Sequence, residues 1–133
     1  MGTSPPYVEP PTPSPAQATA CTSLAARLPA ELRLPFTPTV GRSPVARRTA
    51  VVPASPLTAA WGSPPVVLRC GVQPAGVSQA QLPLEGVTWF EDAVDATRWG
   101  TRTPPYLAVT IPAGNPTGIT GPLLGITDAL LAG

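Results

Sequence analysis

Two cysteines, Cys21 and Cys70, are the most reactive side chains of this sequence and the only two of their kind. They are too far apart for a CxxC motif, and the sequence contains no histidine, so the usual zinc sites are excluded. A disulfide, two buried free thiols or one reactive thiol remain as alternatives. We expect no metal and no cofactor, since the glycines are isolated and form no phosphate loop.

General bases are scarce. All eight basic residues are arginines, so no histidine or lysine is present to activate a serine, threonine or cysteine. Glu91, Asp92 and Asp95 are clustered, but Glu91 and Asp92 would point to opposite faces of a strand. We therefore assign no catalytic residue and interpret the cluster as a solvated strand end. A small carboxylate-dependent hydrolase acting on envelope material, with Glu91 or Asp95, is kept as the alternative function.

Arginines and aromatic side chains are better candidates for binding. In VVLRCGV, Arg69 lies on the face opposite Cys70, and Arg98 and Arg102 share one face of a later segment. With Tyr106 they predict a patch on the uncovered side of a sheet. Such a patch would bind a carboxylate or phosphate of a wall polymer, a lipid head group or a partner protein.

Two other interpretations compete with this patch. Trp99 is most often a core residue, and it would join the patch as a glycan or peptide platform only if it were exposed beside Arg98. Arg69 or Arg102 would simply hold the sheet together if it paired with a nearby carboxylate. The carboxylates considered are Glu85, Glu91 and Asp92.

The elements around the cysteines favour the disulfide. In CTSLAARL, Cys21, Leu24 and Leu28 recur at helical spacing, and Cys70 alternates with Val66, Leu68 and Val72 on one strand face. If the helix covers the sheet, both sulfurs lie in the same layer. The bond would stabilise the fold by about 4 kcal/mol in the chain-entropy model. It would also indicate an oxidising compartment.

The remaining pattern predicts a single α+β domain: a small antiparallel sheet of three to five strands with helices packed on one face. The helices are expected at 22–34, at 55–62, where Ser55 and Pro56 form a start signal, and from Gly121 onward. The strands are expected at 66–72, 86–94, 97–103 and 106–111, with 50–52 as a possible edge strand.

Prolines crowd the N-terminus. SPPYVEPPTPSPA, at 4–16, resembles a spacer between an anchor and a domain, so we expect 1–20 to be a disordered linker and 21–133 the domain. We also expect that a signal or anchor helix once preceded it, which would be the only contact with a membrane. The net charge of +1 offers no footprint for nucleic acid.

One block is specific enough to suggest a family. The succession CTSLAARLP, AAWGSPPVVLRCGV, GVTWF and YLAVTIP, with Trp61 to Val72 as its core, resembles an actinobacterial envelope family, domain of unknown function 3515. The resemblance covers about 20–131 and implies a secreted or membrane-anchored protein. It implies no activity.

These observations together predict an extracytoplasmic cell-envelope domain, on the outer side of the cytoplasmic membrane. It would act as a non-enzymatic binding module for an unidentified envelope protein or wall component. In a third possibility, the proline-rich tail itself makes the partner contact.

Overall fold

The computed structural model describes residues 5–33, 45–74, 80–113 and 118–132. Two helices and eight strands lie in these ranges. The helices are α1 (Pro15–Ala25) and α2 (Thr120–Leu131). The strands are β1 (Glu31–Arg33), β2 (Val45–Thr49), β3 (Thr58–Trp61), β4 (Val66–Cys70), β5 (Gln81–Leu84), β6 (Val87–Glu91), β7 (Arg98–Gly100) and β8 (Leu107–Thr110).

The strands form one sheet in the order β1-β2-β3-β4-β8-β7-β6-β5, and every neighbouring pair is antiparallel. The first four strands follow one another as a meander, and the last four form a second meander that returns toward the first. β4 and β8 join the two halves at the centre of the sheet. β1 and β5 are its two edges.

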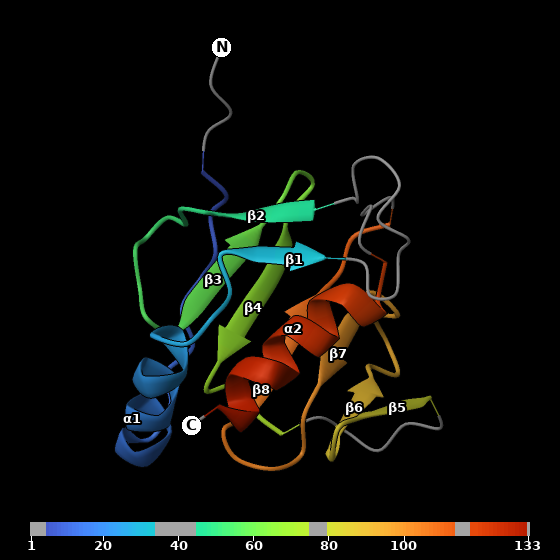
Figure 1. The fold of residues 1–133 in the computed structure, drawn as a ribbon. Helices are drawn as coiled ribbons and strands as arrows, with labels where there is room; N and C mark the ends of the chain where they lie inside the picture. The colour runs from blue at the N-terminus through green and yellow to red at the C-terminus, as the bar shows by residue number, and fades with distance from the viewer. Residues whose placement is uncertain (1–4, 34–44, 75–79, 114–117, 133) are drawn as a thin grey trace.

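One face of the sheet carries the core. Alternate residues of β4 and β8 are buried there, and the buried side of α2 includes Leu123 and Ile126. Figure 1 shows α2 lying across the sheet in front of β7 and β8, while α1 lies beside the lower end of β4. α2 contacts both edge strands, β1 and β5. A buried hydrogen bond of 2.9 Å, from Trp89 Nε1 to Thr127 Oγ1, fixes the helix on the sheet.

The N-terminal segment covers part of the second face. Tyr7 bridges to Val52 in parallel, and the amide of Val8 donates to the carbonyl of Val52 at 2.9 Å. Farther along, the side chain of Arg69 donates from Nε to the carbonyl of Glu9 at 3.0 Å. Val8 is buried, and α1 begins at Pro15 with Ser14 as its N-cap. The predicted linker boundary at residue 20 therefore falls inside a helix.

The predicted fold class is wrong in size and layout. The described residues form one eight-stranded sheet with two helices, not three to five strands with helices packed on one face. The segment predicted as a helix at 55–62 contains β3 instead, and all four β3 residues are buried. A strand that is covered on both faces lacks the alternation of polar and apolar residues that identifies a strand. The prediction therefore followed the helix-start signal of Ser55 and Pro56 and was wrong.

The other helices and strands predicted from the sequence are confirmed only in part. The structure places strands within the predicted 66–72, 86–94, 97–103 and 106–111, and α2 lies where the last helix was expected. β1, β2 and β5 were not predicted. α1 starts upstream of the predicted 22–34, and Val52 makes only a bridge to Tyr7 instead of an edge strand. No helix in the described parts of the chain is long and apolar enough to cross a membrane.

Candidate functional site

The predicted disulfide between Cys21 and Cys70 is confirmed. It links α1 to the end of β4 with a Cα–Cα distance of 5.7 Å, and both cysteines are buried. Neither sulfur is therefore a nucleophile or a metal ligand. Because such bonds persist mainly in oxidising compartments, the disulfide indicates an extracytoplasmic environment.

The second face of the sheet carries a row of residues that spans four strands. Directly paired residues share a face, and the pairing runs from Arg69 on β4 to Ala108 on β8, then to Gly100 on β7 and Phe90 on β6. The row thus has a long side chain at each end and two small residues between them. This arrangement leaves a depression over the centre of the sheet.

A second row lies beside the first. Thr110 pairs with Arg98, and Asp92 follows Phe90 by two residues, so its side chain lies on the same face. The two rows line a hollow of about 280 Å³. Its wall is completed by the segment after β4, and the lining comprises Arg69, Val72, Gln73, Pro74, Phe90, Asp92, Arg98, Gly100, Leu107, Ala108 and Thr110.

The three arginines on this face of the sheet differ in the contacts that they make. Arg98 lies 3.8 Å from Asp92 and 3.6 Å from Asp95 in two partly exposed ion pairs. Arg102 lies over the ring of Phe90, 5.8 Å from its centroid. Arg69 donates from Nε to the carbonyl of Glu9, and the ion pairs formed among the described residues do not include it. Among the described residues, its two terminal guanidinium nitrogens have no hydrogen-bond or ion-pair partner.

The carboxylates of the cluster serve the turn after β6. Two backbone amides, of Asp95 and Val94, donate to Asp92, and these bonds lower its pKa. Asp95 accepts from the hydroxyl and the amide of Thr97, which lowers its pKa as well. Both are ionised at neutral pH. Glu91 pairs with Trp99 on the opposite face, so the predicted divergence of Glu91 and Asp92 is observed.

The remaining candidates from the sequence lie elsewhere. Trp99 is buried on the core face, where it pairs with Val109, so it is not an exposed platform. Tyr106 is half-buried and does not line the hollow. Of the five predicted binding residues, the structure therefore brings Arg69, Arg98 and Arg102 together at this face.

Sequence reasoning missed Phe90 and Gln73. Because side chains alternate along a strand, the sequence could have placed Phe90 and Asp92 on the face opposite Trp89. The residues beside Phe90 on that face depend on how β6, β7 and β8 pair, which the sequence does not show. Small residues at Gly100 and Ala108 were the other available signal.

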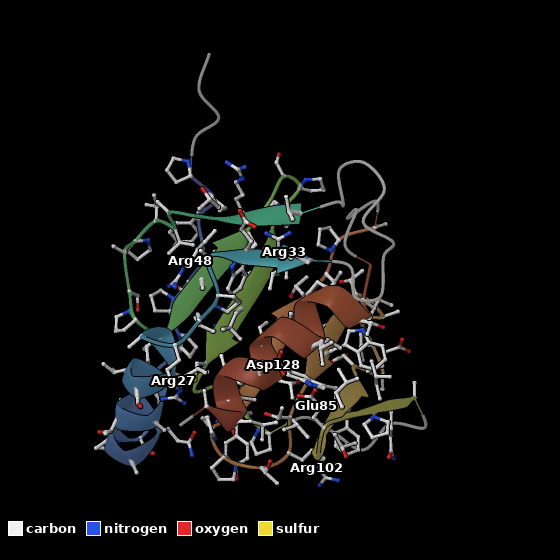
Figure 2. All side chains as sticks on the ribbon, viewed as in Figure 1. Arg27, Arg33, Arg48, Glu85, Arg102 and Asp128 are labelled. Atoms are coloured by element: carbon white, nitrogen blue, oxygen red, sulfur yellow. A yellow bond between two sulfur atoms is a disulfide. The ribbon has the colours of Figure 1, made fainter. Side chains whose placement is uncertain are left out.

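A second pair of carboxyl groups lies on the α2 side of the molecule. Figure 2 shows Glu85, in the β5–β6 turn, next to Asp128 of α2. A hydrogen bond with Asp128, together with repulsion from its charge, raises the pKa of Glu85. No third acidic, cysteine or histidine ligand completes a metal site around it or anywhere else in the described ranges.

Comparison with protein families identifies the chain. A family model described as Protein of unknown function (DUF3515) matches residues 3–132. The chain belongs to this family. The matched range includes the N-terminal segment on the second face, both halves of the sheet and α2. No curated protein and no solved structure is detectably similar to this member of the family.

Proposed function

We propose that this member of the family is a non-enzymatic binding module of the cell envelope, secreted or anchored on the outer side of the membrane. Its partner, an envelope protein or wall component, docks on the second face of the sheet at the hollow between Arg69 and Phe90. The observation that carries this proposal is the hollow itself, with Arg69 and Phe90 at the two ends of a floor of small residues and Arg98 beside that floor. The disulfide supports the compartment.

The electrostatics of the face agree with binding better than with a purely structural role. If the arginines only held the sheet together, Arg69 and Arg102 would pair with Glu85, Glu91 or Asp92. Within the described ranges they form no such ion pair, and Arg98 alone is paired, at distances near the limit of an ion pair. Exposed pairs of this kind contribute little to stability.

The hydrolase alternative is less well supported. A carboxylate pair for acid and base catalysis needs one carboxyl with a raised pKa and a second one ionised, both facing the substrate. Asp92 and Asp95 both have lowered pKa values, and Glu91 faces away from the hollow. No described residue near the hollow is placed to donate a proton.

The proposal is tested by comparing two double variants with equal loss of charge. Arg69→Ala/Arg98→Ala removes the hollow's arginines, and Arg33→Ala/Arg47→Ala removes two exposed arginines at the β1–β2 edge. Immobilised proteins are incubated with detergent-solubilised envelope fractions, and the captured components are quantified by mass spectrometry. We expect the Arg69→Ala/Arg98→Ala variant to capture at least about tenfold less of the specifically bound components, since hydrogen bonds to charged groups are stronger than those between neutral groups.

Folding of both variants is checked by circular dichroism and thermal melting. The proposal is wrong if the two folded variants capture the same components in the same amounts as the unchanged protein.

A further inference from the structure

We propose that the hollow binds the free C-terminal carboxylate of a peptide, with the last side chain of that peptide against Phe90. This inference rests on the proposed function and specifies its ligand. The carboxylate lies between Arg69 and Arg98, and the apolar group lies over Gly100 and Ala108.

The charge of the lining selects a monoanion. Arg69, Arg98 and Asp92 line the hollow, which gives a formal charge of +1. Outside this lining, Asp95 pairs with Arg98 and Arg102 lies over Phe90, and their opposite charges leave the formal sum at +1. A carboxylate would neutralise this charge, whereas a phosphate, with close to two negative charges at neutral pH, would leave an excess. Asp92 itself would repel the second charge.

The geometry favours a forked contact. Arg69 already donates from Nε to the carbonyl of Glu9, which holds the side chain in place and leaves its two terminal nitrogens to donate. A planar guanidinium fixed in this way matches the two oxygens of a carboxylate. The cost of ordering this side chain is already met in the free protein, which favours binding.

The size and lining of the hollow favour the end of a peptide. About 280 Å³ lies just below the range of drug-sized ligand sites, so it accommodates one or two residues. Val72 and Pro74 provide an apolar wall, and Gln73 and Thr110 can bond to a peptide amide.

The test uses the peptide N-acetyl-Ala-Ala-Leu as a free acid and as its C-terminal amide. Glucuronic acid and inorganic phosphate are titrated in parallel. Binding is followed by two-dimensional NMR of the isotope-labelled protein. We expect the free acid to shift the amide signals of Phe90, Arg98, Gly100 and Ala108, and the amide to bind at least about tenfold more weakly.

Three variants locate the site. Arg69→Ala removes the forked contact, and Ala108→Leu fills the floor of the hollow without any change of charge. Each substitution should weaken the binding of the free-acid peptide by about tenfold or more. Arg47→Ala, on β2, removes the same charge as Arg69→Ala at a side chain that is 80% exposed and should leave binding unchanged.

The outcomes separate this inference from the proposed function. The proposal of a C-terminal carboxylate ligand is overturned if the peptide amide binds as tightly as the free acid. It is also overturned if glucuronic acid or phosphate binds as tightly as the free acid. Failure of the free acid to bind at millimolar concentration overturns it as well. In each of these cases the function stands if the Arg69→Ala/Arg98→Ala variant still loses envelope capture, and falls if it does not.

Discussion

Arg69 shows how much a single side chain's place in the sequence can reveal. Its position next to Cys70 predicts that it lies on the face opposite the core, and the structure places it there. The hydrogen bond to Glu9 could not be predicted, because the N-terminal segment was expected to be a free linker. The sequence therefore predicts which face the residue lies on, but not which groups it contacts.

The raised pKa of Glu85 can be tested through the pH dependence of the protein's stability. This pKa is raised above the usual 4.5 by Asp128, so the folded state holds the proton more tightly than the unfolded state. This contribution to stability is complete below about pH 4.5 and is lost as the pH rises through the folded-state pKa. Glu85→Gln removes the repulsion. We expect a higher melting temperature than the unchanged protein at about pH 7 and a difference that shrinks toward about pH 4.

Glu9→Gln, at an exposed carboxyl far from Asp128 in sequence, is the control with the same change of charge. The lowered pKa values of Asp92 and Asp95 remove stability as the pH falls, but they act equally in all three proteins and cancel. A melting difference that stays constant across this pH range would contradict the assignment.

At the scale of elements, the alternation of apolar residues decided which strands could be predicted. β4 and β8 each have one buried and one partly open face, so the pattern of Val66, Leu68 and Cys70 is legible. β3 is buried on both faces, β5 contains Pro83, and β1 and β2 are rich in charge. Of these, β5 does alternate Leu82 and Leu84 with Gln81 and Pro83, but a proline inside the run argues against a strand. β1, β2 and β3 lack the alternation of a half-buried strand.

The site was only partly predictable for a related reason. Local periodicity predicts that Arg69 lies opposite Cys70 and that Arg98 and Arg102 share a face. That β4 pairs with β8 instead of β5 is a long-range choice, and it brings Phe90, Gly100 and Ala108 into one row with Arg69. Local sequence does not specify such pairings.

The docking of the N-terminal segment on the sheet is tested by two glycines with the same unusual backbone. Gly71 has φ +95° and a Cβ built there lies 2.5 Å from Pro13 Cβ, whereas Gly86 has φ +93° and an added Cβ meets nothing within 4 Å. Both alanine variants carry the backbone strain, about 1 kcal/mol or more. Only Gly71→Ala also displaces Pro13.

We therefore expect Gly71→Ala to lose about 1–3 kcal/mol more unfolding free energy than Gly86→Ala, measured by urea denaturation. Proteolysis near residue 10 should also become faster in Gly71→Ala. Equal losses in the two variants would show that the segment does not stabilise the domain.

For the whole molecule, the disulfide joins the N-terminal part of the chain to the centre of the sheet. It closes a sequence separation of 49 residues, for which the chain-entropy model gives about 4 kcal/mol. Reduction, or the double substitution Cys21→Ala/Cys70→Ala, should lower the unfolding free energy by about this amount and lower the melting temperature.

Intact mass provides the direct check. We expect the protein purified from an oxidising compartment to resist alkylation until a reductant is added, and then to gain two hydrogens before it takes up the alkylating reagent. Ready alkylation of both cysteines in the folded protein without reductant would remove the support for an extracytoplasmic environment.

The two edge strands of the sheet determine whether copies of this protein can aggregate by strand pairing. β1 has three residues, two of them an ion-paired Glu31 and Arg33, and Pro83 in β5 has no amide hydrogen to donate. Neither edge is a good template for a further strand. Copies at high local concentration should thus resist edge-to-edge polymerisation.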